Sequence, residues 1–290
     1  MSVSIAEYLG QRVDVIAPRI RPSMVGAVGA LVPTCPFSGG LCSKLDGRKP
    51  YPPVCSVRAN GELFVVCSDR LVPAKARVLT ASHLALLGDV TSLLMPGADE
   101  ALVGFRRQVG VTLNRRMVFL DYVIALNDPD YSGRRAVILE IQGGGETSNT
   151  GTISRHVQAW SADKGRTNAM LGEPLPRVGI IPNNAWKRQL EQIFRKAPLA
   201  GKFGGAFGLV MGPKLFDYVH NAIGLEGGWF PDWEIALIEI KERTSLEPGP
   251  VPVESGRAFF MKYSDFVSRV SSFEIPEDAS NPLVGDFSTL

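Results

Sequence analysis

Hydrophobic and polar positions divide the chain into a short first part with little periodicity and a longer part in which strand-like and helix-like patterns follow one another. Residues 1–75 are rich in Pro and Gly and contain one good strand candidate, Leu63 to Val66. From Pro73 onward, apolar runs of strand length alternate with stretches that have a helical period. We expect helices at 74–87, 99–109, 184–196 and 214–223, and strands at 117–126, 136–142, 206–211 and 233–240.

This order of elements predicts an α/β fold, with a mixed-sheet core flanked by helices. The change of pattern near Pro73 indicates two units, an N-terminal metal-binding segment at 1–75 and a core at 76–290 that includes a C-terminal tail. Because the first unit has few periodic positions, we expect a bound metal ion to hold much of it together. Apolar residues make up 45% of the chain, enough for one substantial core, and no run of ~18 uncharged apolar residues predicts a membrane span.

The charge is nearly balanced over the whole chain, with a formal net charge of +2. The tail contains Glu274, Glu277, Asp278 and Asp286 and no Lys or Arg, so the rest of the chain is mildly basic. This distribution permits a polyanion partner such as DNA without requiring one.

All four cysteines fall within about one ninth of the chain, which requires a shared structural reason. No signal peptide is visible in Met1 to Gly10, and a reducing cytosol disfavours disulfides. We therefore expect a cytoplasmic protein with a four-thiolate structural metal centre. Two disulfides, or buried thiols with no common role, are the alternatives. The ligands of this centre would be Cys35, Cys42, Cys55 and Cys67, whose spacing does not choose between iron and zinc.

Two acids lie inside apolar strands, Asp121 in the first and Glu140 in the second. A carboxylate in a strand that is covered on both faces needs a cation or hydrogen-bond donors. The period of two places Glu140 and Gln142 on one face of their strand. Carboxylates in such an oxygen-rich corner suit Mg²⁺, which is bound by one or two carboxylates and by substrate phosphates. The alternative is an ordinary ion pair with one of the nearby arginines, Arg106, Arg107, Arg115, Arg116, Arg134 and Arg135.

Asp121 followed by Leu139 to Gln142 resembles the signature of the PD-(D/E)xK nuclease superfamily, in the variant where Gln replaces the usual Lys. Together with the cysteines upstream, the chain resembles the NotI-like type II restriction endonucleases. The likeness extends to residues 67–71, around the last cysteine, and to the start of the helix at Asn184. It spans roughly Ala6 to Ile240, with low identity between the motifs.

The resemblance implies roles for these residues. Asp121 and Glu140 would hold the catalytic Mg²⁺, and Gln142 would help to position the attacking water. Since Gln is neutral and cannot act as a base, the metal ion would contribute more to lowering the pKa of the water and to stabilising the pentacovalent phosphate. The four cysteines would bind a structural ion, which is iron in the resembled enzymes.

Basic residues near the two acidic strands and on the helix at 184–196 are candidates for contacts with DNA phosphates. A solvated surface is the alternative for each of them. The candidates are Arg115, Arg116, Arg134, Arg135, Lys187 and Arg188. On the same helix we place Arg195 and Lys196 off the apolar face, with Lys187 and Arg188. Gly143 to Gly145 are expected to let the backbone pass close to a neighbouring segment or to DNA.

We expect a Mg²⁺-dependent type II restriction endonuclease that cuts both strands of a specific DNA duplex. A homodimer is expected because one metal site cuts one strand and a two-fold protein matches a palindromic target. One alternative is a PD-(D/E)xK nuclease of DNA repair or of a mobile element. Another is a non-catalytic DNA-binding protein in which the two acids form structural ion pairs.

Overall fold

The computed structural model describes most of the chain, with short gaps that lie mainly in the first half. The described residues are 2–16, 18–21, 24–25, 32–42, 45–46, 49–50, 54–76, 78–113, 115–245 and 247–272. The acidic tail at 273–290 therefore lies outside the described residues.

A six-stranded mixed sheet forms the centre of the molecule, in the order β16-β15-β14-β11-β10-β9. β11, β14 and β15 run parallel to one another, whereas β9, β10 and β16 are antiparallel to their neighbours. This arrangement confirms the prediction of a mixed α/β core. The strands are β9 (Val103–Leu113), β10 (Arg116–Leu126), β11 (Ala136–Gln142), β14 (Ala206–Met211), β15 (Ile235–Glu242) and β16 (Val253–Met261).

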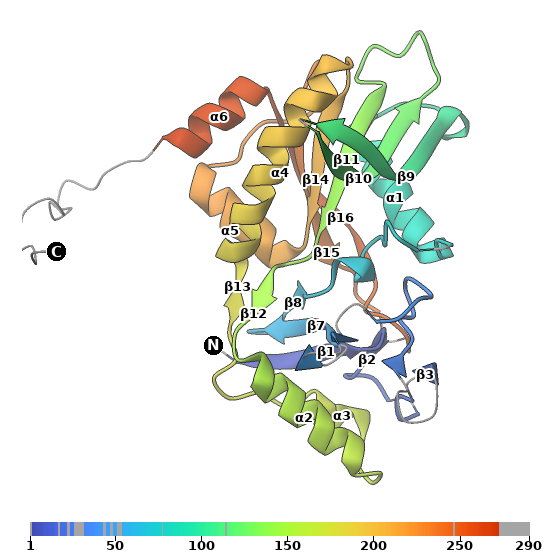
Figure 1. The fold of residues 1–290 in the computed structure, drawn as a ribbon, viewed down its shortest axis with the longest axis vertical. Helices are drawn as coiled ribbons and strands as arrows, with labels where there is room; N and C mark the ends of the chain where they lie inside the picture. The colour runs from blue at the N-terminus through green and yellow to red at the C-terminus, as the bar shows by residue number, and fades with distance from the viewer. Residues whose placement is uncertain are drawn as a thin grey trace, which may run out of the picture.

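Helices cover both faces of this sheet (Figure 1). One apolar core joins α4, α5 and α6 to the sheet, and a second joins α1 to the opposite face. Among the described helices, none combines the length and the apolar character needed to cross a bilayer. The helices are α1 (Ala81–Leu94), α2 (Thr150–Ala162), α3 (Asn168–Leu171), α4 (Pro182–Lys202), α5 (Pro213–Ile223) and α6 (Tyr263–Ser271), with 3-10 turns η1 (Ser68–Arg70) and η2 (Glu100–Leu102).

The N-terminal segment forms a four-stranded sheet of its own, in the order β2-β1-β7-β8. This sheet has a separate apolar core, which includes Phe64 and, from α2, Trp160. The sequence pattern indicates only one strand here. The expectation that a metal ion holds much of this segment together therefore left out the sheet and its apolar core, which also hold it together. The strands are β1 (Val3–Tyr8), β2 (Gln11–Arg12), β7 (Val54–Ala59) and β8 (Glu62–Val65), and the short pairs are β3 (Met24–Val25), β4 (Val32–Pro33), β5 (Leu45–Asp46), β6 (Lys49–Pro50), β12 (Glu146–Thr147) and β13 (Ile180–Ile181).

The glycine triplet after β11 brings the two sheets together. Gly144 N donates a hydrogen bond to Val65 O at the end of β8. A Cβ on Gly143 would lie 2.5 Å from the same oxygen, and one on Gly144 would lie 2.7 Å from the ring of Phe64. Only glycine permits this approach without displacing β8. The expectation of a close neighbouring segment is thus confirmed, and the neighbour is β8.

Two predicted helices differ from the structure. The stretch 99–109 is not a helix, because the Asp99 cap starts only the short turn η2 and the chain then enters β9. β9 pairs with β10 along its length, and this pairing prevails over the local helix signal. The helix predicted at 74–87 begins instead at Ala81, where Thr80 and His83 form a reciprocal capping box.

A buried ion pair joins the N-terminal sheet to the segment before β16. Arg70 Nε lies 2.7 Å from Glu7 Oε1, and both side chains are buried. Val251 N donates to Glu7 Oε1 at 2.6 Å, and Arg70 also donates to Val251 O. Ser56 donates its hydroxyl to the other oxygen of Glu7. The carboxylate and the guanidinium therefore satisfy each other and the backbone of a distant segment.

Replacing Arg70 by Met is expected to lower the free energy of unfolding by about 3–5 kcal/mol, because it leaves the charge of Glu7 buried and unpaired. Equilibrium unfolding in urea measures the change. As a control, Glu254→Gln removes the exposed cross-strand pair with Lys241 and should cost about 0–1 kcal/mol. Equal small effects for the two variants would contradict the role given to the buried pair.

Candidate functional site

Two carboxylates meet where β10 and β11 separate. The ladder between the two strands ends at the pair of Tyr122 and Leu139. Beyond it, Asp121 N donates to Glu140 Oε1 at 3.1 Å, and Ile141 N donates to Asp121 Oδ2 at 3.1 Å. Each acid thus accepts a hydrogen bond from the backbone of the opposite strand. These bonds fix both side chains next to each other at the edge of the gap.

A buried lysine from α4 supplies the cation that meets this pair. Lys196 Nζ lies 2.7 Å from Glu140 Oε1 and donates to Phe119 O at 2.8 Å. Lys196 is 2% exposed and Glu140 is 7% exposed, so water screens their interaction little. The cation in direct contact with Glu140 is therefore this lysine and not one of the arginines considered from the sequence.

The placement of Lys196 off the apolar face of its helix is wrong. Gln189, Ile193 and Lys196 are all buried, because spacings of three, four and seven residues bring them onto the same side of α4. The signal that finds Lys196 is this heptad spacing from Gln189. The neighbouring charges of Arg195 and Lys187, which are exposed, instead suggest that Lys196 also lies on the polar face.

Two glutamine side chains complete the corner around the acids. Gln189 Nε2 donates to Gln142 Oε1 at 2.7 Å, and Gln108 Nε2 donates to Asp121 Oδ1 at 3.3 Å. Because Gln189 already engages the carbonyl oxygen of Gln142, the part of Gln142 that remains for a ligand is its amide nitrogen, which is a donor. Gln142 therefore faces the site as a neutral donor and not as a base.

The site concentrates negative charge in a desolvated corner. Burial raises the pKa of Glu140 to about 7, and the charge of Asp121 acts in the same direction, against Lys196. Burial also raises the pKa of Asp121, against the Ile141 amide and Lys196. The exposed Lys75 also acts on Asp121, but one buried ammonium for two desolvated carboxylates leaves a charge deficit that a divalent cation would correct.

The donor set fits Mg²⁺ better than a metal with a full set of protein ligands. Within the described residues, no three or more His, Cys, Asp or Glu side chains are grouped for holding a metal ion. Mg²⁺ needs only one or two carboxylates, since waters and substrate phosphates complete its coordination. Asp121 and Glu140 are therefore sufficient for that ion.

The cysteines lie in two pairs on two hairpins. Cys35 N donates to Gly40 O, and Cys42 N donates to Pro33 O, so a tight turn brings the first pair close together. In the second pair, Cys67 N donates to Cys55 O at 3.1 Å. All four are buried, and none forms a disulfide bond. The disulfide alternative is therefore not supported.

Two features of the cysteine cluster suit thiolate ligands. Ser38 N lies 3.4 Å from Cys35 Sγ, and such amide donation stabilises a metal-bound sulfur. Burial raises the pKa of the Cys55 thiol well above its ordinary value, helped by the nearby charges of Glu7 and Cys67. A metal ion would reverse this effect by binding the thiolate. The four-cysteine centre stays a prediction, because the described cysteines are not gathered as closely as bound ligands would be.

The structure separates the basic candidates for DNA contact into two groups. Arg134 donates to Trp233 O at 2.8 Å and to Asp232 O at 2.9 Å, so it holds the loop before β15. Arg188 lies 2.5 Å from Glu146. These two arginines form the first group, because each has a structural partner. Lys187 belongs to neither group and is exposed on α4.

The other group lies at the two ends of the acidic strands. Arg115 and Arg116 are at the β9–β10 turn, and Arg135 is just before β11. Arg116 and Arg195 line a cavity of about 570 Å³ between β10 and α4, on the face of the sheet from which Lys196 reaches Glu140. Of the candidates, Arg116 is thus the one that lines a described cavity on this face.

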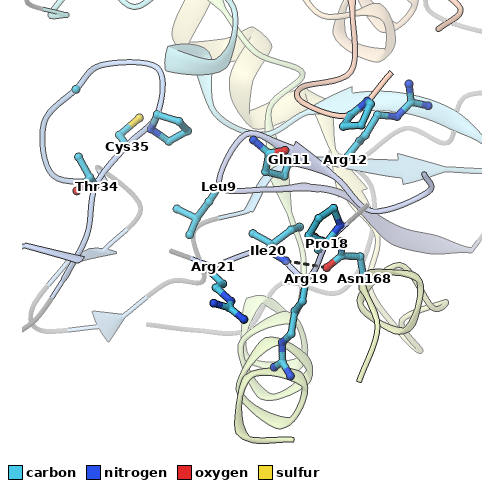
Figure 2. A pocket seen from close by; sticks show the side chains of 13 residues that line it. Leu9, Gln11, Arg12, Pro18, Arg19, Ile20, Arg21, Thr34, Cys35 and Asn168 are labelled. Carbon is cyan, nitrogen blue, oxygen red and sulfur yellow. Dashed lines mark hydrogen bonds between the residues drawn. The ribbon is translucent and has the colours of Figure 1, made fainter. Parts of the chain in front are cut away.

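A second cavity, of about 610 Å³, lies beside the N-terminal sheet (Figure 2). Arg19, Arg21 and Cys35 contribute to its lining. Arg19 stacks over the ring of Trp160 at 4.5 Å and donates to Trp160 O at 2.8 Å, so its guanidinium closes the end of α2. Neither acid of the β10–β11 corner lines this cavity, and it has no part in the candidate site.

Comparison with known proteins assigns no family to this chain, because no protein-family model and no curated protein sequence matches it.

In protein freed of divalent cations, the raised pKa of Glu140 predicts a loss of stability with rising pH. The pKa is about 7 in the folded state and 4.5 ordinarily, so the folded protein binds this proton more tightly than the unfolded chain does. The stabilisation is complete below the lower value and is lost as pH rises through the higher one. Glu140→Gln should unfold like the wild type near pH 4 and be more stable by about 1–3 kcal/mol at pH 8. Unfolding curves in EDTA test this, and a difference that is the same at both pH values would contradict it.

Purified protein is expected to contain about one tightly held iron or zinc ion per chain, bound by the cysteines. Cys55→Ser should lower the metal content and the free energy of unfolding, since a thiolate ligand is lost. Elemental analysis and unfolding curves measure both, with Ser92→Ala, on the exposed side of α1, as the control. A wild-type protein with neither ion and four freely titratable thiols would rule out the centre.

Proposed function

We propose that the chain is a Mg²⁺-dependent endodeoxyribonuclease of the PD-(D/E)xK type, acting as a type II restriction endonuclease on both strands of a specific DNA duplex. The observation that carries the proposal is the pair of the half-buried Asp121 and the buried Glu140, held side by side at the point where two adjacent strands separate. Structural ion pairs alone account less well for the pair, because one lysine serves two desolvated acids.

In this proposal, Asp121 and Glu140 hold Mg²⁺ between them. When bound, the ion would lower the pKa of a coordinated water and stabilise the negative charge that develops on the phosphate. Gln142 would donate from its amide nitrogen to a phosphate oxygen, a role that its hydrogen bond from Gln189 favours. The exposed arginines would guide the DNA backbone, with Arg116 nearest to the face that α4 covers.

The wider assignment adds a partner and a second ion. A homodimer would place two such sites on the two strands of a symmetric target. Iron or zinc at the four cysteines would be structural, because four thiolates leave no open coordination position. The N-terminal sheet would then support the site through the contact of β8 with the glycine triplet.

Asp121→Asn and Glu140→Ala should each abolish cleavage of plasmid DNA in Mg²⁺, because each removes a metal ligand. Removing a single electrostatic contributor of this kind commonly costs about 10²–10³ in rate, and loss of the ion should cost more. Binding of the specific duplex in Ca²⁺ or EDTA, measured by fluorescence anisotropy, should remain close to that of the wild type. Asp265→Asn, on the exposed start of α6, is the control.

The outcomes separate the candidate functions. Wild-type rates in either acid variant would disprove the site. A wild-type protein that binds duplex DNA but never cuts it would favour the non-catalytic alternative. Cleavage with no preference for sequence would instead favour a nuclease of DNA repair or of a mobile element.

A further inference from the structure

Lys196 has more hydrogen-bond donors than the protein uses. An ammonium carries three N–H donors. Two of them meet protein acceptors, Glu140 Oε1 at 2.7 Å and Phe119 O at 2.8 Å. No other acceptor within the described part of the chain completes the set. Lys196 is 2% exposed, so bulk water does not provide an easy substitute. One donor of a buried cation thus remains for a group that enters the corner.

The position of this ammonium is fixed from two sides. On α4, Ile193 and Ala197 pack into the core beneath the sheet and hold the helix in place. Phe119 O lies on β10 two residues before Asp121, in the part of β10 that does not pair with β11. Lys196 therefore bridges the two sides of the gap at which the acids meet, and it cannot reorient without losing its contacts with Phe119 O and Glu140.

The residue at position 142 leaves a charge requirement unmet. Hydrolysis of a phosphodiester develops negative charge on the phosphate oxygens, and a fixed positive group at that point lowers the barrier. Gln142 is neutral, and its carbonyl oxygen is held by Gln189. Lys196 is in direct contact with Glu140 of the acidic pair, and it reaches this acid from the helix and not from the strand that carries Gln142.

We propose that Lys196 is a catalytic residue of this site, whose remaining N–H donates to a non-bridging oxygen of the scissile phosphate. The proposal rests on the proposed nuclease function. In the reaction, water adds to phosphorus, one P–O ester bond breaks, and the proton lost by the water ends on the leaving oxygen. Lys196 stays protonated throughout and acts through its charge and its donor.

The same contact has a second effect, on the metal ion. The ammonium lies against the carboxylate of Glu140, so its positive charge would oppose a divalent cation held by the same carboxylate. Removing the charge of Lys196 should therefore tighten binding of the metal while it slows cleavage. A lysine with only a structural role would not produce this combination, because its loss would weaken metal binding and stability together.

The test compares Lys196→Gln, Lys196→Arg and the control Lys202→Met, at the exposed end of the same helix. Gln can still hydrogen-bond within the corner but has no charge, and Arg keeps the charge. Binding of Mn²⁺ in the absence of DNA is measured by calorimetry, cleavage of plasmid by single-turnover kinetics in Mg²⁺, and folding by thermal unfolding. The Gln variant should bind Mn²⁺ several-fold more tightly and cleave about 10²–10³-fold more slowly, whereas the Arg variant keeps more activity than the Gln variant.

Each outcome decides the matter. Wild-type cleavage by a folded Gln variant, or unchanged or weaker Mn²⁺ binding, would overturn the role of Lys196 and leave the nuclease assignment intact. If the Gln variant does not fold, the Arg variant provides the test. A folded Arg variant as inactive as Glu140→Ala would show that a positive charge at this position does not support cleavage, and would overturn the proposal. Absence of cleavage by the wild-type protein would overturn the proposed function, and this inference with it.

Discussion

The desolvation of two neighbouring carboxylates is the constraint on which the candidate site depends. Asp121 and Glu140 are held by backbone amides of opposite strands, so neither can turn toward solvent without breaking its hydrogen bond to the other strand. The fold offsets the resulting charge with a single buried ammonium from α4. Such an arrangement is poor for stability and good for binding a cation, a trade that is common where function requires strain or unpaired charge. The central sheet, the helix above it and the separation of β10 from β11 all serve to maintain this balance.

The N-terminal sheet contributes to the same corner from the opposite direction. β8 lies against the glycine triplet that follows Gln142, and Arg70, three residues after Cys67, enters the buried pair with Glu7. The chain therefore leads from the last cysteine to the ion pair within a single turn, η1. Through these contacts, the cysteine hairpins pack together with the strand that carries Glu140 and Gln142. They belong to one packed unit, although the sequence pattern divides the chain near Pro73.

Much of the core could be predicted because its elements are locally consistent. The runs at 136–142 and 206–211 are strands with those bounds, and the helix expected at 214–223 is α5, which ends at Gly224 in the left-handed conformation that glycine favours. The failures have a common cause in distant partners. Residues 103–109 lie in a strand because β10 pairs with them, and Lys196 is buried because Glu140 offers it an acceptor on the face of the sheet that α4 covers. Helix periodicity shows that a face exists, but it does not show which cation on a helix a distant carboxylate will recruit.

The buried ion pair also has a consequence for synthesis on the ribosome. Glu7 is made early, yet the Val251 amide that completes its hydrogen bonds lies 244 residues further along the chain. Contacts of such long range form late, after the entropy of closing a very large loop has been overcome. During translation Ser56 and Arg70 can reach Glu7 early, but the ion pair lacks the Val251 backbone groups that complete it until most of the protein has been made. The N-terminal sheet of the nascent chain would be open to chaperones for that time, and the joint between the first and the last parts of the fold would form only near the end of synthesis.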